Sequence, residues 1–207
     1  MVRATAPTIG LVGGIGSGKT AVAEAWRAAG CCVCESDQLA RAALRDPAVR
    51  GQLVAWWGPG ILAADGEIDR PAVARIVFAD ESQRRRLEGL THPWIERSRR
   101  ASFAAAPPET PAFVIDAPLL LEVGLDRECD AVVFVDAPQA LREERVRQRR
   151  GWPADELARR EAAQWPLERK RSLATHVVVN DADAETLRRR ADEVLRAIVA
   201  AGGRSAR

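Results

Sequence analysis

Residues 8–26 read TIGLVGGIGSGKTAVAEAW and predict, in order, a strand, a glycine-rich loop and a helix. The apolar run over 8–12 is typical of a buried strand, and the alanine-rich run over 19–29 is typical of a helix. Between them, residues 13–20 fit the pattern G-x-x-x-x-G-K-[ST] of a phosphate-binding loop. Because a strand precedes this pattern and a helix follows it, we predict a loop that holds the phosphates of a nucleotide triphosphate.

The residue types within this loop suit that chemistry. Glycines let the backbone turn its N–H groups towards phosphate oxygens, and the helix N-terminus adds a partial positive charge. We predict that Lys19 contacts the β and γ phosphates and that the hydroxyl of Thr20 ligates magnesium. A glycine-rich turn that served only packing would not explain a lysine followed by a hydroxyl.

Outside the loop, the composition is that of an ordinary globular protein. Of its 207 residues, 47% are hydrophobic and 29% are charged, and 31 basic against 29 acidic residues leave a net charge of +2. This balance favours neither nucleic acid nor a membrane as a partner, so any anion site must be local. Lys19 and Lys170 are the only lysines among the basic residues, and each calls for an explanation because lysine and arginine are not interchangeable.

The cysteines and the N-terminal segment indicate the cellular compartment of the protein. Cys31, Cys32 and Cys34 in CCVC have no second paired cluster of cysteines, as zinc sites built on such clusters need, and Cys129 stands alone. We expect them to be small buried side chains in a reduced protein. No segment resembles a signal peptide or a membrane span, so we expect a cytoplasmic protein.

Short apolar runs alternate with long segments rich in alanine, arginine, leucine and glutamate along the rest of the chain. This pattern is typical of an α/β fold in which helices cover both faces of a parallel sheet of about five strands. Asp69 and Pro71 predict a helix start within the first long helical region. The further strands are expected over 31–36, 112–116, 131–136 and 176–179, and the further helices within a region ending near 106, over 138–170 and over 183–201.

Asp37 follows the second predicted strand. The helix over 19–29 leads the chain away from the loop, and the strand over 31–36 leads it back parallel to the first strand. Asp37 is therefore expected at the carboxyl edge of the sheet, where open α/β sheets bind ligands. Its carboxylate could cap the next helix, or it could accept the proton of a phosphoryl acceptor.

Two further aspartates end predicted strands, Asp116 in FVIDAPLL and Asp136 in VVFVDAPQ. Either carboxylate could hold magnesium through water behind the phosphate loop. We favour Asp116, because the apolar segment after it is expected near an acceptor, whereas an arginine-rich helix follows Asp136.

Arg142, Arg145 and Arg149 are spaced to share one face of a predicted helix. With Glu143 and Glu144 between them, such a run is usually a solvated charged face. We favour a lid, in which the arginines cover the transferring phosphoryl group and exclude water. A nucleic-acid surface is less favoured because aromatic residues are sparse there.

These residues together resemble the dephospho-coenzyme A kinases, a family of P-loop kinases similar to nucleoside monophosphate kinases. The similarity runs from about Ile9 to about Ala200. It rests on the order and spacing of IGLVGGIGSGKTAVAEAW, VCESDQLAR, DGEIDRPAVARIVF, LTHPWI, DAPLLLEVGLD, VVFVDAPQALREERVRQR and a late Q…K…VVVND. The resemblance implies ATP-dependent phosphorylation of the ribose 3′-hydroxyl of dephospho-coenzyme A, the last step of coenzyme A synthesis.

The resemblance also implies roles for individual residues. The catalytic base falls on Asp37, and the lid arginines fall on Arg145 and Arg149, with Lys19 and Arg145 acting on the phosphates. The ATP-binding loop falls on Gly14, Ile15, Gly16, Ser17, Gly18, Lys19, Thr20 and Ala21. The acceptor-binding region falls around Arg70, His92, Pro93, Asp116, Leu119 and Leu120.

The implied fold is a single P-loop kinase domain over residues 1–207 with a five-stranded parallel sheet. Its core is expected over 8–56, 111–139 and 171–201, with a helical acceptor-binding region over about 57–110 and an arginine-rich lid over about 140–170. The implied co-substrate is ATP with Mg²⁺, and the implied partner is the small molecule dephospho-coenzyme A. Neither nucleic acid nor a membrane is expected, and the chain is expected to be a monomer or a small homo-oligomer.

Three departures from the family pattern are present. Glu35-Ser36-Asp37 replaces the usual Asp-Ala-Asp and keeps the second acid, which is the one the reaction needs. Thr20-Ala21 replaces Ser-Thr and keeps the magnesium ligand. Thr175-His176 replaces Ala-Asp, and we expect His176 to be a hydrogen-bonded residue at a strand start, not a catalyst.

Two other functions compete with this interpretation. One is a kinase that phosphorylates another nucleotide or small molecule on the same scaffold. The other is a non-catalytic nucleotide switch, which would carry an N-K-x-D segment to recognise guanine. The nearest segment, Asn180-Asp181, lacks the lysine, so the switch is disfavoured.

Overall fold

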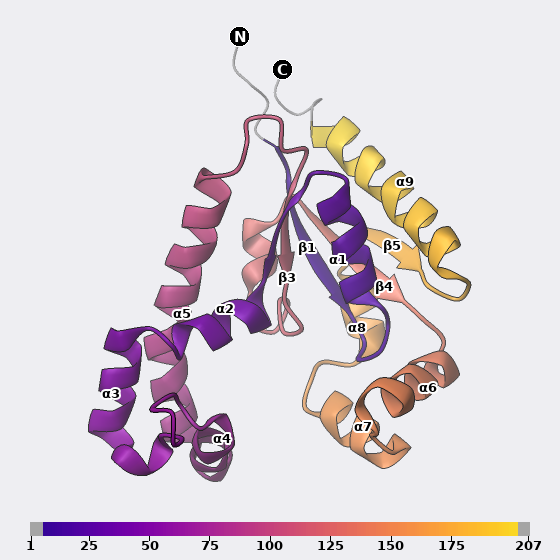
Figure 1. The fold of residues 1–207 in the computed structure, drawn as a ribbon. Helices are drawn as coiled ribbons and strands as arrows, with labels where there is room; N and C mark the ends of the chain where they lie inside the picture. Colours follow the sequence, from indigo (N-terminus) through magenta and orange to yellow (C-terminus); the bar gives the residue numbers. More distant parts are fainter. Residues whose placement is uncertain (1–5, 203–207) are drawn as a thin grey trace. The chain divides into compact units, whose positions relative to one another are not determined.

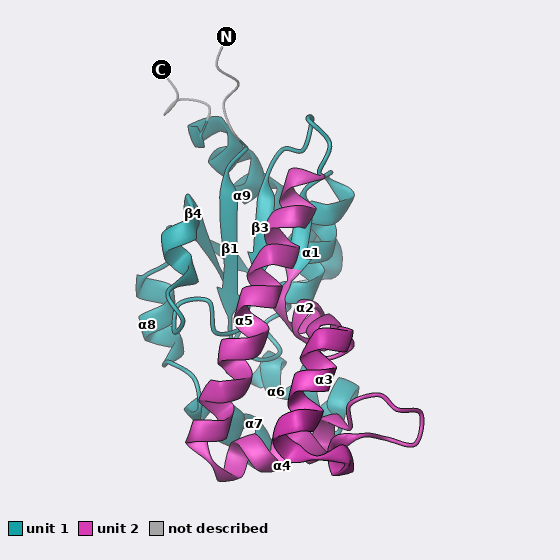
Figure 2. Cartoon of the chain, turned by 90° about the vertical axis from the view of Figure 1, so that its left-hand side faces the viewer, with its two compact units in different colours: residues 1–34, 106–207 teal, residues 35–105 magenta. Residues whose placement is uncertain are grey.

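The computed structural model describes residues 6–202 of the chain. The chain divides into two compact units, coloured separately in Figure 2. Residues up to Cys34 together with those from Ala106 onward form the first, which we call the sheet unit. Residues Glu35–Ala105 form the second, which we call the helical unit.

A five-stranded parallel sheet, in the order β2-β3-β1-β4-β5, organises the sheet unit (Figure 1). The predicted α/β fold is therefore confirmed, and each strand lies within one residue of its predicted bounds. The central strand β1 pairs with β3 on one side and with β4 on the other. The strands are β1 (Thr8–Gly13), β2 (Cys32–Glu35), β3 (Phe113–Asp116), β4 (Ala131–Asp136) and β5 (His176–Val179).

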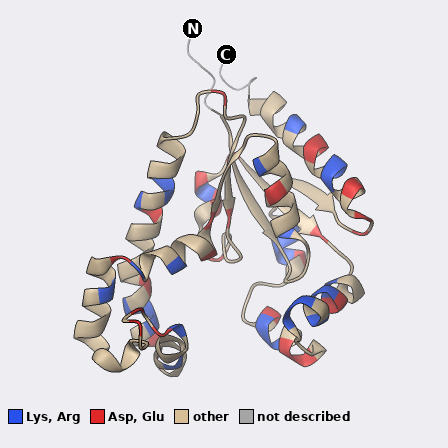
Figure 3. Ribbon diagram, in the orientation of Figure 1, with Lys and Arg blue, Asp and Glu red and all other residues tan. Residues whose placement is uncertain are grey.

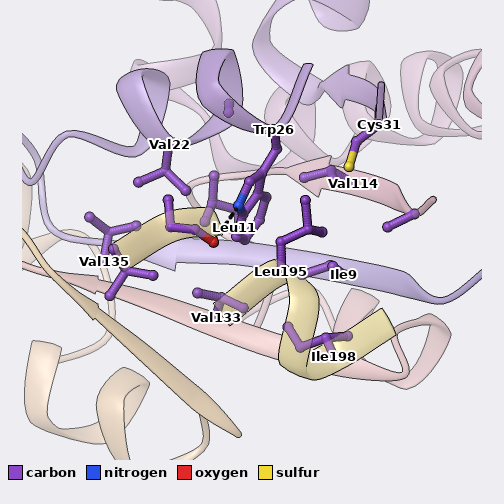
Figure 4. Close-up of a cluster of buried hydrophobic side chains, with 14 of the residues drawn as sticks. Ile9, Leu11, Val22, Trp26, Cys31, Val114, Val133, Val135, Leu195 and Ile198 are labelled. Atoms are coloured by element: carbon purple, nitrogen blue, oxygen red, sulfur yellow. Dashed lines mark hydrogen bonds between the residues drawn. The ribbon is translucent and has the colours of Figure 1, made fainter. Parts of the chain in front are cut away.

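Helices α1 (Lys19–Ala28) and α9 (Ala184–Gly202) pack against each other and against the sheet. Ile9 and Leu11 of β1, two residues apart, lie in the same buried cluster, as alternation in a strand requires (Figure 4). Trp26 of α1 is fully buried there, and its ring N–H donates a 2.9 Å hydrogen bond to the carbonyl of Ala191 in α9. This apolar core fixes α1, and with it the loop that precedes α1.

The helical segment predicted over 138–170 is confirmed and contains three helices. Gly151 ends the first in a left-handed conformation, and Pro153 and Pro166, which lack a backbone N–H, precede the second and third. The helices are α6 (Gln139–Arg150), α7 (Ala154–Ala162) and α8 (Leu167–Ser172), and a short 3-10 turn, η2 (Leu125–Glu128), follows β3.

Aspartate caps begin three of the four α-helices of the helical unit. The side chains of Asp46, Asp69 and Asp80 accept backbone hydrogen bonds at these starts, so the predicted start at Asp69 is confirmed. The elements are α2 (Ser36–Ala43), α3 (Pro47–Trp57), the 3-10 turn η1 (Pro59–Ile61), α4 (Arg70–Ala79) and α5 (Glu81–Ala104). Their apolar side chains form a separate core around Leu53 and Ile61. No helix within residues 6–202 is long and apolar enough to cross a membrane.

Candidate nucleotide and acceptor site

The glycine-rich loop leaves β1 and turns into α1 through left-handed glycines. Gly16 has a φ of 78° and Gly18 a φ of 98°, conformations that L side chains adopt only with strain. The backbone N–H of Ser17 bonds the carbonyl of Gly14 at 3.2 Å, which closes the turn. This backbone is the arrangement that the predicted phosphate loop requires, with its amides at the N-terminus of α1.

Lys19 and Thr20 occupy the first two positions of α1. The ammonium of Lys19 donates to the carbonyls of Gly13 (2.9 Å) and Gly14 (3.2 Å), so its side chain lies along the loop. Thr20 is exposed, which leaves its hydroxyl accessible to a magnesium ion at the loop. Within residues 6–202 no group of three histidine, cysteine or acidic side chains forms a metal site.

Asn180, directly after β5, holds the loop and an arginine together. Its side-chain amide donates a 2.7 Å hydrogen bond to the carbonyl of Ser17, and its oxygen accepts one from Arg145 at 3.1 Å. Asn180 is only 4% exposed, and a methyl group on Gly18 would lie 2.1 Å from its amide nitrogen. The sequence placed this residue in the late VVVND motif and in the nearest match to a guanine-reading segment, but gave it no role in the site. Its position at a strand end, like Asp116 and Asp136, was the available signal.

The three predicted lid-face arginines of α6 differ in their surroundings. Arg142 is buried and forms a close ion pair with Glu161 of α7, so the less favoured alternative of a solvated charged face does not hold for it. Arg145 is half-buried against Asn180, whereas Arg149 is exposed. Figure 3 shows acidic residues interleaved with basic ones along α6 and α7.

Helix α6 packs directly on the phosphate loop. A methyl group on Gly16 would lie 2.7 Å from the backbone oxygen of Arg142, and one on Gly14 would lie 3.0 Å from its guanidinium. The predicted lid region therefore touches the loop with its buried first arginine, and Arg145 lies one turn further along the helix.

The two strand-end aspartates flank β1. Asp116 ends β3 and lies in register with Leu11, and Asp136 ends β4, one position beyond the Gly13–Val135 pair. Asp136 forms a close ion pair with Arg171 of α8, which occupies one of its carboxylate oxygens. In the strand order β3 lies between β1 and β2, so Asp37 follows a strand that is not adjacent to β1.

In the helical unit, Asp37 lies in the first turn of α2. The N-cap position belongs to Glu35, so the interpretation of Asp37 as a helix cap is wrong. Asp37 and Arg70 both line a hollow of about 210 Å³, completed by Ala40, Arg41 and Leu44. Sequence reasoning missed Arg41, one helical turn after Asp37, although the i, i+4 spacing could have identified it.

The remaining predicted acceptor residues lie in two places. His92 and Pro93 are exposed within α5 of the helical unit. Leu119 and Leu120 follow β3 in the sheet unit; Leu119 is 43% exposed and Leu120 is fully buried. A methyl group on Gly10 of β1 would lie 2.9 Å from the side chain of Leu120. Leu120 therefore packs against β1 and holds in place the segment that carries Leu119.

Comparison with known proteins identifies the family of this chain. A model of the dephospho-CoA kinase family matches residues 7–186. The chain belongs to this family.

Similar proteins match nearly the whole chain. It is 42% identical over 190 residues to a dephospho-CoA kinase of Anaeromyxobacter dehalogenans, covering 90% of each chain. It is 38% identical over 192 residues to one of Geobacillus kaustophilus, covering 91% of this chain and 95% of the relative. A solved structure from Thermus thermophilus is 34% identical, covers 93% of this chain and 97% of that chain, and has a TM-score of 0.82.

The departure from the dephospho-CoA kinase pattern at Thr175-His176 has a structural role. The hydroxyl of Thr175 contacts both the N–H and the carbonyl of Val132, each at 3.0 Å, and lies 2.9 Å from a ring nitrogen of His176. The expectation of a hydrogen-bonded histidine at a strand start is confirmed, because His176 is the first residue of β5.

The cysteines do not form disulfides with one another: Cys31, Cys32, Cys34 and Cys129 are all free. Cys31 and Cys34 are buried, whereas the other two are half-buried, so the expectation of burial is confirmed in part. Burial raises the pKa of the Cys31 thiol to about 11, so the thiol remains protonated at neutral pH.

Proposed function

We propose that this chain transfers the γ-phosphoryl group of ATP to the ribose 3′-hydroxyl of dephospho-coenzyme A, giving coenzyme A and ADP in the cytoplasm. The observation that carries the proposal is the G-x-x-x-x-G-K-T loop, seated between β1 and α1, in a chain of the dephospho-CoA kinase family. The free cysteines support a reducing compartment.

On the donor side, the loop amides and Lys19 bind the phosphates of ATP. Arg145, oriented by Asn180, lies on the helix packed against the loop, where a guanidinium can neutralise charge on the transferring group. Arg149 is the second lid arginine in this proposal. Magnesium would be held by Thr20 and, through water, by Asp116, and would supply positive charge that stabilises the transferring phosphoryl group.

On the acceptor side, Asp37 orients the 3′-hydroxyl and accepts its proton as the bond to phosphorus forms. Arg70 shares the hollow with Asp37, and its guanidinium can pair with an acidic group of the acceptor. His92, Pro93 and Leu119 contribute contacts, while Leu120 supports the segment that carries Leu119. Since phosphoryl transfer has a loose transition state, positioning and charge neutralisation contribute more than the basicity of Asp37.

Mass spectrometry tests the proposal directly. Dephospho-coenzyme A incubated with the protein, ATP and magnesium should gain one phosphoryl group, and fragmentation should locate it on the 3′-oxygen. A parallel panel of nucleoside monophosphates should remain unmodified. Phosphorylation of a panel member in place of dephospho-coenzyme A would establish the rival kinase, and nucleotide binding without any transfer would establish the switch.

A further inference from the structure

Lys170, at the centre of α8, is completely buried. Its ammonium donates to the carbonyl of Pro118 at 2.9 Å and to the side-chain oxygen of Gln164 at 2.9 Å, and it lies 2.8 Å from a carboxylate oxygen of Glu122. The three N–H donors of the ammonium thus meet three acceptors. Nothing in the proposed phosphoryl transfer uses this lysine.

These contacts join two segments that are distant in sequence. Residues 117–124, which we call the acceptor loop, follow β3 and carry Leu119. Residues 163–166, which we call the hinge, connect α7 to α8. The same Glu122 oxygen that lies near the ammonium accepts the backbone N–H of Trp165 at 3.0 Å, so the carboxylate bonds the hinge directly as well. The guanidinium carbon of Arg169 lies 3.4 Å from the centre of the Trp165 ring, a second contact between the hinge and α8.

Stability alone does not account for such a network. Removing two charges from water costs free energy that a buried ion pair regains only with good geometry, and apolar residues of similar size often stabilise a protein equally well. A buried ion pair does fix relative positions, because either partner left alone would be a buried unpaired charge. The compact ammonium matters too, since the planar guanidinium of arginine directs its donors differently. In a chain whose basic residues are otherwise arginine apart from Lys19, this supports a specific geometric role.

We infer that Lys170 is a positioning residue that couples the acceptor loop to the lid formed by α6 and α7. The lid returns to the sheet through the hinge, so a change in the lid that alters Gln164 or Trp165 is transmitted through Lys170 and Glu122 to the acceptor loop. Acceptor binding and lid closure over the nucleotide then favour each other. This inference rests on the proposed function, because it takes the acceptor loop to contact dephospho-coenzyme A.

Calorimetric titration of dephospho-coenzyme A, with and without a non-hydrolysable ATP analogue, measures this coupling. In the wild-type protein the analogue should tighten acceptor binding by about five- to a hundredfold. In Lys170→Met, and in Glu122→Gln, which keeps the side-chain volume, that ratio should fall to near one. Binding of the analogue alone should change little. Lys170→Arg should not restore the ratio, because its donors cannot reach the same three acceptors.

Arg189→Gln is the matched control, because it removes a basic member of an exposed pair, Arg189–Glu193, in the same unit. It should keep the wild-type ratio. A purely structural role would lower the melting temperature of Lys170→Met and leave the ratio of Glu122→Gln unchanged, which would overturn the inference. So would a wild-type protein that binds the acceptor equally well with and without the analogue. A wild-type protein that binds no dephospho-coenzyme A would instead overturn the proposed function, and the inference with it.

Discussion

The phosphate loop and the hollow around Asp37 are built in different ways. In the loop, Gly18 presses against Asn180, and Ser17 is only 1% exposed, so backbone contacts hold the geometry. In the hollow, the ionisable side chains of Asp37, Arg41 and Arg70 are exposed on the first turns and surface of helices. This difference indicates that the loop has its binding geometry before a ligand arrives. The hollow instead contributes individual charged side chains that can interact with a bound ligand. Substitutions in the loop should therefore act by changing its backbone geometry, and substitutions in the hollow by changing side-chain charge.

Asp37→Asn should produce the largest effect and tests whether the hollow acts through a single charge. The amide keeps the size of the side chain but cannot accept the proton, so turnover should fall by about a hundred- to ten-thousandfold. ATP affinity, measured by titration, should remain within a few-fold of wild type. Glu88→Gln, an exposed substitution in α5, is the control and should turn over normally. Normal turnover of Asp37→Asn would remove this residue from the reaction.

Gly18→Ala should come next and tests whether the loop acts through its shape. The added methyl would lie 2.1 Å from the Asn180 amide nitrogen at a φ of 98°, so the loop must distort. We expect ATP affinity to fall by at least about a hundredfold, measured by fluorescence titration. Gly51→Ala is the control, because nothing lies within 4 Å of the new methyl in α3, and alanine favours a helix. If both variants bound ATP normally, the loop would not be a shape-dependent site.

Asn180→Ala should have an intermediate effect and tests the link between loop and lid helix. It removes the hydrogen bonds to Ser17 and Arg145, so kcat/KM for ATP should fall by about ten- to thirtyfold, as expected for one or two buried hydrogen bonds. The neighbouring Asp181→Asn is the control, since Asp181 is exposed and its carboxylate pairs with Arg190 at 2.6 Å, away from Ser17 and Arg145. An equal loss in both variants would mean that the end of β5 matters only for folding.

Short-range patterns made much of this molecule predictable. The strands and the phosphate loop were predictable because apolar runs and the G-x-x-x-x-G-K-T spacing are local in sequence. The role of Asn180 was not, because its partner Ser17 lies 163 residues away. The burial of Arg142 was missed for the same reason, since Glu161 becomes its neighbour only after the chain turns at Gly151. The alternative in which Asp37 caps α2 failed because β2 ends at Glu35 and α2 begins directly at Ser36, which places the cap two residues before Asp37.

The smallest expected effect concerns acid stability and tests how firmly the helices behind the hollow are held. A hydrogen bond from Trp94 lowers the pKa of Asp46, and hydrogen bonds from Ser82 lower that of Asp80. Since these pKa values are lower in the folded state, their stabilisation is complete above the unfolded pKa of about 3.9 and is lost as the pH falls through the folded values.

Hydrogen exchange should therefore show α3 and α5 losing protection below about pH 4 before β1 does, because β1 lies within a cluster of buried apolar side chains that do not titrate in this range. In Asp46→Asn with Asp80→Asn, asparagine still caps a helix but does not titrate, so the loss of protection should become less dependent on pH. Arg100→Gln, which removes the exposed pair of Arg100 with Glu96 in α5, serves as the control and should keep the wild-type acid dependence. If β1 and α5 lost protection at the same pH, the two units would unfold together. The contrast between the loop and the hollow would then concern ligand binding and not stability.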